Sequence, residues 1–220
     1  MKKLPGVVFT FFLVTPALPG FADTLSLDQA PASLKTTVLV FNMARVRSKV
    51  LGQAEEEATR IFREVGLELE WKECPCSQSA GPGDVILRII PRLFGSMKAG
   101  FRDSDLGFAP TGEEGGVLAT IFFHRVEAIT KGGPIAPVLG NAIAHELGHL
   151  LLGRNAHSAD GIMQAHWSRK VLKLASRGSL HFTTEQAQRM RTRVAARIEP
   201  QEAAPVPMLA ALTREETSHR

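Results

Sequence analysis

The distribution of apolar and polar residues predicts alternating strands and helices in the first part of the chain. Thr36 to Val46 is rich in β-branched and apolar residues, as expected for a strand. From Ser48 to Val65 the apolar residues recur at helical spacing, and Gly66 ends the predicted helix. The same patterns predict strands at 67–73 and 85–93, which are separated by a loop rich in Gly and Pro.

The middle of the chain combines a long loop, a strand and an apolar helix. Residues 94–116 are rich in Gly and polar side chains, which predicts a surface excursion. Val117 to Val126 is expected to form the next strand. A helix is predicted from Ile135 or Val138 to Leu152, with Gly153 as its C-cap.

The last predicted elements are two helices that follow an irregular stretch at 155–165. Residues 167–176 have the pattern of a short helix. Thr183 or Thr184 begins a final helix that extends to about Ile198. Gln186 follows Thr183 by three residues and completes a capping-box pattern, in which two side chains satisfy the free N–H groups of the first turn.

Composition divides the chain into four segments. A basic start, an apolar run and small residues before Asp23 are typical of an export signal over residues 1–22. Residues 23–35 form a short N-terminal segment, and 36–198 have the length of one domain. Residues 199–220 are rich in Pro, Ala and Glu, which predicts a disordered tail. We therefore expect a secreted or periplasmic protein.

Charge and hydropathy exclude two classes of function. The formal net charge of the 220 residues is +4, and removal of residues 1–22 takes away Lys2 and Lys3 and no acid, which leaves +2 (4 − 2). This balance is not that of a nucleic-acid-binding protein. The apolar run of the export signal is far shorter than the roughly 20 residues that span a bilayer, so we expect no stable membrane insertion, with an uncleaved membrane anchor as the less favoured alternative. The oligomeric state is not indicated.

The two cysteines, Cys74 and Cys76, are separated only by Pro75. An exported chain can keep disulfides, although two cysteines do not make a disulfide framework. Three states are therefore open: a local disulfide, which is slightly favoured, two free thiols, or pairing with another molecule. A metal site is disfavoured because no further ligands are evident nearby.

The apolar helix carries the residues with the clearest chemistry, His145-Glu146-Leu147-Gly148-His149. Side chains four residues apart project from the same face of a helix, so His145 and His149 can reach one ion. Zn²⁺ is the ion expected for imidazole ligands in an exported hydrolase. Glu146 is rotated away from the first ligand and can act as a general base on zinc-bound water.

A catalytic zinc site usually has three protein ligands, so a third must come from elsewhere. His157 follows His149 by eight residues, beyond the glycine that ends the helix, and is the first candidate. Asp160 and His166 are less favoured, and Glu185 in the last helix is less favoured again.

The run HELGHLLLGRNAH followed by Gly161-Ile162-Met163 resembles the metzincin clan of zinc peptidases, whose pattern is a zinc helix, a glycine turn, a third histidine and a Met-turn. The resemblance implies an α+β fold: a twisted mixed sheet with a backing helix, a zinc-binding helix, the Met-turn and a C-terminal helix. It also implies Met163 as an apolar floor below the metal. An extended substrate would pair with an edge strand, for which we expect 117–126, with Phe122 and His124 as possible cleft residues.

Two features depart from that family. The glycine and the third histidine stand four and eight residues after His149, whereas the family has them three and six residues after its second ligand. His157 therefore needs a wider turn to reach the ion. Some members place a tyrosine two residues after the methionine, where this chain has Ala165 and contains no tyrosine at all. Transition-state charge would then fall to the zinc and backbone donors, with His166 as a possible helper.

These patterns predict a secreted zinc metalloendopeptidase that acts on a peptide or protein substrate. Two alternatives remain open at this point. One is a zinc hydrolase of a non-protein or cell-wall amide, and the other is a catalytically silent, zinc-stabilised binding protein.

Overall fold

The computed structural model describes residues 34–74, 81, 83–95 and 100–198. The predicted export signal and C-terminal tail lie outside these residues. Five strands form one sheet with the order β2-β1-β3-β5-β4. Their bounds are β1 Leu34–Asn42, β2 Leu67–Glu73, β3 Val85–Ile90, β4 Gly107–Phe108 and β5 Leu118–Phe122.

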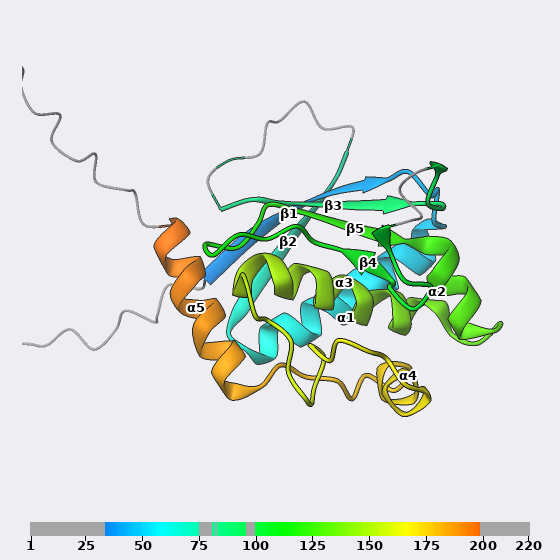
Figure 1. Cartoon of the computed structure of the whole chain (residues 1–220). Coiled ribbons are helices and arrows are strands. Elements are labelled where there is room, and N and C mark those ends of the chain that lie inside the picture. Colours follow the sequence, from blue (N-terminus) through cyan, green and yellow to red (C-terminus); the bar gives the residue numbers. More distant parts are fainter. Residues whose placement is uncertain (1–33, 75–80, 82, 96–99, 199–220) are drawn as a thin grey trace, which may run out of the picture. The chain divides into compact units, whose positions relative to one another are not determined.

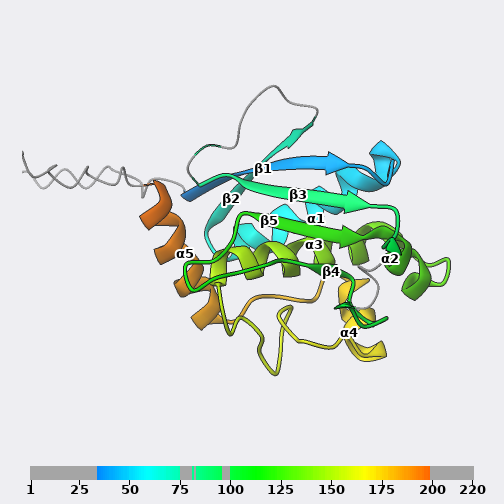
Figure 2. The same ribbon diagram turned by 45° about the horizontal axis from the view of Figure 1, so that its top comes forward.

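The sheet is mixed because its last strand runs against the others. β1 pairs in parallel with β2 and β3, and β3 pairs in parallel with β5. β4 is antiparallel to β5, with Gly107 opposite Ile121 and Phe108 opposite Thr120. Figure 2 shows β4 at the edge of the sheet, alongside α3. β4 therefore forms the border of the sheet on the side of the zinc-binding motif.

Five helices complete the described part of the chain. They are α1 Ser48–Glu64, α2 Phe123–Thr130, α3 Ile135–Leu152, α4 Arg169–Ala175 and α5 Thr184–Ile198. α1 and α3 pack against each other on one face of the sheet (Figure 1). In β3 the side chains alternate between fully buried and half-buried, because only one face lies against these helices. The predicted α+β fold with a mixed sheet and a backing helix is confirmed.

Helix α3 is the most deeply buried helix of the fold. Fourteen of its 18 residues are buried, and it contacts α1, α5 and three strands. It is long and apolar enough to cross a membrane, but 83% of it is buried inside the protein. Its apolar composition is therefore explained by packing, since a helix that is apolar on all sides belongs in a core.

Three predicted strands extend too far. The strand expected at 85–93 ends at Ile90. The strand expected at 36–46 ends at Asn42, whose side chain accepts a hydrogen bond from the Val46 N–H and donates one to the Val46 carbonyl. These two local hydrogen bonds take the place of the backbone bonds between strands that would continue β1. The strand expected at 117–126 ends at Phe122, where α2 begins. The prediction of one strand was wrong there because an apolar run of this length does not distinguish a strand from a strand followed by a buried helix.

The end of β2 leads into the cysteine pair. Cys74 is disulfide-bonded, which excludes a free thiol at this position. Cys76 lies outside the described residues. The disulfide agrees with the two predicted states in which the cysteine is oxidised, a local disulfide or pairing with another molecule.

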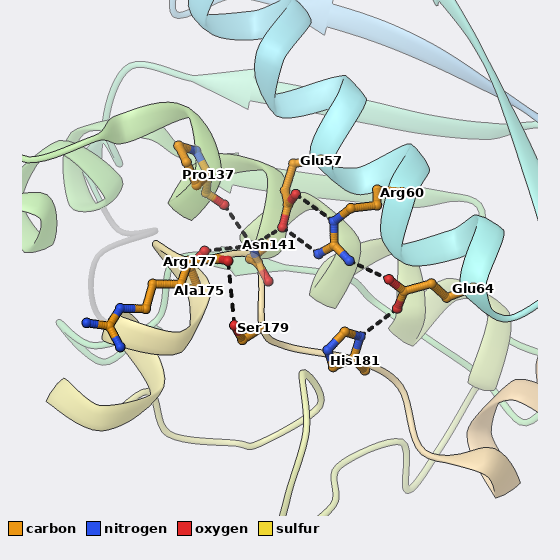
Figure 3. A network of polar contacts seen from close by, with 9 residues as sticks. All are labelled: Glu57, Arg60, Glu64, Pro137, Asn141, Ala175, Arg177, Ser179 and His181. Atoms are coloured by element: carbon orange, nitrogen blue, oxygen red, sulfur yellow. Dashed lines mark hydrogen bonds and ion pairs between the residues drawn. The ribbon is translucent and has the colours of Figure 1, made fainter.

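A polar network ties α3 to its neighbours, as Figure 3 shows. Asn141 has no exposed surface, and its side-chain amide group donates to a carboxylate oxygen of Glu57 at 3.0 Å. The same group donates to the carbonyls of Pro137 and Ala175. Arg60 holds the Glu57 carboxylate by two hydrogen bonds. One buried side chain thus connects α3 to α1 and to the end of α4.

Replacement of Asn141 by alanine is expected to lower the free energy of unfolding by about 1–3 kcal/mol. The substitution removes a buried donor from the Glu57 carboxylate and from the Ala175 carbonyl, which keep only their bonds to Arg60 and to the Gly178 N–H. Urea unfolding of the metal-free protein measures the change. Thr130→Ala, which removes an exposed hydroxyl at the end of α2, is the control. Equal stability of Asn141→Ala and wild type would contradict the role of this network.

Candidate active site

Helix α3 places His145 and His149 one turn apart on the face that lies beside β4. Their Nε2 atoms are 3.2 Å apart and their ring planes are nearly perpendicular. Two ring nitrogens this close to each other either share a proton or face a common ligand. The helical spacing therefore produces the pair that the sequence predicted.

His157 joins this pair from the loop that follows α3. One ring nitrogen from each of His145, His149 and His157 lies within 4.8 Å of the other two, so the three residues form a group that can hold a metal ion. The His157 ring centroid is 4.7 Å from that of His149. Asp160, His166 and Glu185 are not members of this group, and His166 instead contacts Arg102 at 3.3 Å.

The turn after α3 explains how His157 reaches the pair despite its distance in sequence. The Gly153 N–H closes the helix on the His149 carbonyl, and Gly153 has a φ of 70°. A Cβ atom at this position would lie 2.6 Å from the Glu113 carbonyl oxygen. Only glycine fits this backbone shape and this space. The next residue, Arg154, donates its N–H to the Gly112 carbonyl, which fixes the start of the loop that carries His157 to the segment between β4 and β5.

The protonation state of His145 follows from its partner. Its Nδ1 lies 2.8 Å from the Ile162 carbonyl oxygen, which can only accept a hydrogen bond. Nδ1 therefore carries the proton and Nε2 presents a lone pair toward His149. Burial lowers the pKa of His145 to about 4 and that of His149 to about 3. Both rings are neutral at neutral pH, as metal ligands must be.

Met163 follows the Ile162 carbonyl and packs under the same helix. It has no exposed surface. A Cβ atom on Gly148 would lie 2.8 Å from the Met163 sulfur, so the helix and this methionine are in close contact. Ile162 also donates its N–H to the His181 carbonyl. This turn therefore supports the helix and orients His145 through one carbonyl group.

Glu146 is buried between α3 and the edge strand. It is 7% exposed, and a Cβ atom on Gly107 would lie 2.7 Å from its Cγ atom. Any side chain at Gly107 would displace the carboxyl group, so β4 contacts Glu146 through bare backbone. Burial, and then the charge of Asp105, raise the pKa of Glu146 to about 8.

A cavity of about 480 Å³ connects these groups. All three histidines and Glu146 line it, and so does the edge strand with the residues before it. Its apolar part includes Phe101, Phe108 and Trp167. Ala165 lines the cavity at the position where some metzincins have tyrosine, whereas His166 does not.

The edge of the cleft differs from the sequence-based expectation. β5 is an inner strand, and Phe122 is 1% exposed in the core. His124 belongs to α2 and does not line the cavity. The border is β4, which lies in the segment predicted to be a surface excursion. A strand of two residues is too short to show an alternation of buried and exposed side chains, so no local pattern predicts it.

The donor set fits a zinc ion. Three neutral imidazoles each offer one nitrogen, all within 4.8 Å of one another, and His145 is oriented by a backbone carbonyl, as is usual for histidine ligands of zinc. The buried carboxyl group of Glu146 lines the same cavity, where a cation would lower its pKa and favour the ionised form.

Comparison with known proteins gives only partial similarities. No protein-family model matches the chain, and no curated protein matches it either. Among solved structures, a zinc-dependent peptidase from Methanocorpusculum labreanum is 14% identical with a TM-score of 0.48, covering 70% of this chain and 99% of its own. Archaemetzincin from Methanopyrus kandleri is 18% identical with a TM-score of 0.48, and the match covers 77% of this chain and 99% of archaemetzincin. Metalloproteinase-II from Bacteroides fragilis is 12% identical with a TM-score of 0.47, and the match covers 76% of this chain and 55% of that protein.

Glu146→Gln is expected to raise the free energy of unfolding of the metal-free protein relative to wild type. This difference is expected to grow as the pH rises. The unfolded carboxyl group has an ordinary pKa of 4.5, while the folded one has a pKa of about 8. The folded state therefore holds a proton that the unfolded state releases, and wild-type stability falls between these two values. The neutral amide does not titrate, and contributions from the histidines cancel in the comparison.

Urea unfolding with a chelator at pH 5, 7 and 9 measures this difference. Glu127→Gln, on the exposed surface of α2, serves as the control. A difference between Glu146→Gln and wild type that stays constant with pH would contradict the burial of an ionisable carboxyl group.

Proposed function

We propose that this chain is a zinc-dependent peptidase in which His145, His149 and His157 bind the metal and Glu146 is the general base. The observation that carries the proposal is the convergence of three neutral imidazoles beside a buried carboxyl group in one cavity. Two ligands with a glutamate between them on one helix, and a third ligand from a loop, are the arrangement that metal-assisted hydrolysis requires.

The chemistry divides between the metal and the side chains. A bound zinc ion would supply Lewis acidity, which acidifies water and polarises a carbonyl group. Glu146 accepts a proton from the attacking water and later donates it to the leaving nitrogen. Burial raises the pKa of Glu146 in the metal-free protein, and a bound cation would lower it toward the ionised form that the first step needs.

The edge strand supports a peptide as the substrate. β4 ends the sheet and lines the cavity beside Glu146. An extended peptide can add to such an edge by backbone hydrogen bonds and bring one of its carbonyl groups to the site. Phe101 and Phe108, whose rings are 5.1 Å apart, would contact an apolar side chain of this peptide.

A second candidate is a hydrolase of a small non-protein or cell-wall amide. The cavity volume of about 480 Å³ favours it, because this is the size of a small-molecule site. A silent zinc-binding protein is supported less, since it gives no reason for a buried carboxyl group that lines the cavity.

We also propose that the chain is exported. The predicted signal at residues 1–22 and the disulfide-bonded Cys74 both support an oxidising compartment. N-terminal sequencing of the protein recovered outside the cytoplasm is expected to begin at Asp23. Recovery of the protein only in the cytoplasm, beginning at Met1, would contradict export.

Glu146→Gln is expected to reduce kcat for peptide cleavage by about 10²–10⁴-fold while the protein still binds zinc. The amide has the same shape but accepts no proton from water. Cleavage of a peptide library by the zinc-loaded protein, followed by mass spectrometry, measures the change. Glu114→Gln is the control, because Glu114 is exposed and does not line the cavity.

The same assay separates the candidate functions. No cleavage of peptides but release of amine from small amides would favour the second candidate. Wild-type protein that binds zinc and cleaves neither would contradict a hydrolase.

A further inference from the structure

The third histidine of the group is held differently from the other two. His145 and His149 belong to a buried helix, and the His145 ring donates to a backbone carbonyl. His157 is exposed on a loop, and its ring has no hydrogen bond to any of the described residues. Its position must therefore be fixed through the backbone on either side of it.

Gln186 contacts both neighbours of His157. Its side-chain Nε2 donates to the Ala156 carbonyl at 3.2 Å and to the Ser158 hydroxyl oxygen at 3.1 Å. The Gln186 side chain comes from the first turn of α5 and is only 8% exposed. A buried amide thus spans the loop directly behind the third histidine.

The other end of the Gln186 side chain is fixed by the helix. Its Oε1 accepts the Thr183 N–H at 2.9 Å, and the Gln186 N–H donates to the Thr183 hydroxyl at 3.2 Å. These two bonds form a capping box, which either glutamate or glutamine can complete. Capping alone therefore does not explain why this residue is an amide.

The hydrogen bonds to the loop explain why residue 186 carries an amide. Only an amide combines an acceptor for Thr183 with donors for Ala156 and Ser158. The Ser158 hydroxyl gives its own proton to the Asp160 carbonyl, so it needs a donor on its other side. The Ser158 N–H in turn bonds to the Met163 carbonyl at 3.0 Å. The residues around His157 are thereby tied to α5 and to the turn that orients His145.

We propose that Gln186 is a positioning residue for the third metal ligand, which rests on the proposed zinc site. It uses the rigid first turn of α5 to hold Ala156 and Ser158, and so places the His157 imidazole beside the helical pair. Residues that orient metal ligands typically contribute 10–100-fold to metal affinity. Gln186 acts through the ligand's neighbours, by way of the Ala156 carbonyl and the Ser158 hydroxyl, since it has no hydrogen bond with the histidine ring.

Two substitutions separate positioning from capping. Gln186→Glu keeps the acceptor for Thr183 but replaces both loop donors with an oxygen that faces the Ala156 carbonyl. Gln186→Met keeps the approximate volume and removes every side-chain hydrogen bond of this residue, while its backbone N–H still donates to the Thr183 hydroxyl. Thr183→Val is the matched control, because it removes one capping bond and leaves the contacts to Ala156 and Ser158 in place. Arg189→Ala removes an exposed donor to the Arg154 carbonyl, farther from His157 along the same loop.

The measurement is the zinc dissociation constant of the full chain by competition with a chelator, together with X-ray absorption at the zinc edge to count imidazole ligands. Both Gln186 variants are expected to bind zinc about 10–100-fold more weakly, with a fall from three imidazoles toward two. Thr183→Val and Arg189→Ala are expected to stay within about threefold of wild type. The glutamate variant adds a negative charge near a cation, which by itself would strengthen binding, so a loss of affinity there points to lost positioning.

The outcomes distinguish this inference from the proposed function. A wild-type chain that binds no zinc would overturn the proposed zinc site itself. A wild type that binds zinc with three imidazoles, with unchanged affinity in both Gln186 variants, would overturn the positioning role alone. An equal loss in Thr183→Val would also overturn it, because the effect would then come from the helix cap.

Discussion

The burial of α3 is the constraint on which the rest of the structure depends. This helix packs between the sheet, α1 and the segments that follow it, so nearly every side chain on it must be apolar or satisfied. The amide nitrogen of Asn141 is satisfied by three hydrogen bonds, although its buried Oδ1 has no partner among the described residues, and the His145 ring donates to one backbone carbonyl. The Glu146 carboxyl group instead faces the cavity, so a buried acid lies next to two neutral imidazoles.

The two sides of the cavity are built by different means. On the helix side, regular spacing places the ligands, and packing keeps them rigid. On the other side, the positions depend on single contacts: bare backbone at Gly107, a turn at Gly153 and a buried amide at Gln186. Such contacts are the usual way to place functional groups on loops, because loops have no internal ladder to fix them.

The sequence predicts the helical half of this site better than the loop half. The spacing of His145 and His149 follows from helix geometry alone, and the capping box at Thr183 and Gln186 is also as predicted. The edge strand was missed because β4 pairs over only two residues, and long-range pairing leaves no local pattern at that length. The loop contacts of Gln186 were missed as well, since they join residues 28 to 30 positions apart.

The central claim is that the three histidines bind one zinc ion. Elemental mass spectrometry of the purified chain after zinc reconstitution, beside His149→Ala and His157→Ala variants prepared identically, tests it most directly. The account predicts about one zinc per wild-type chain and a strong reduction in both variants. A wild-type chain without zinc, or a His157→Ala variant that retains the full amount, would contradict it.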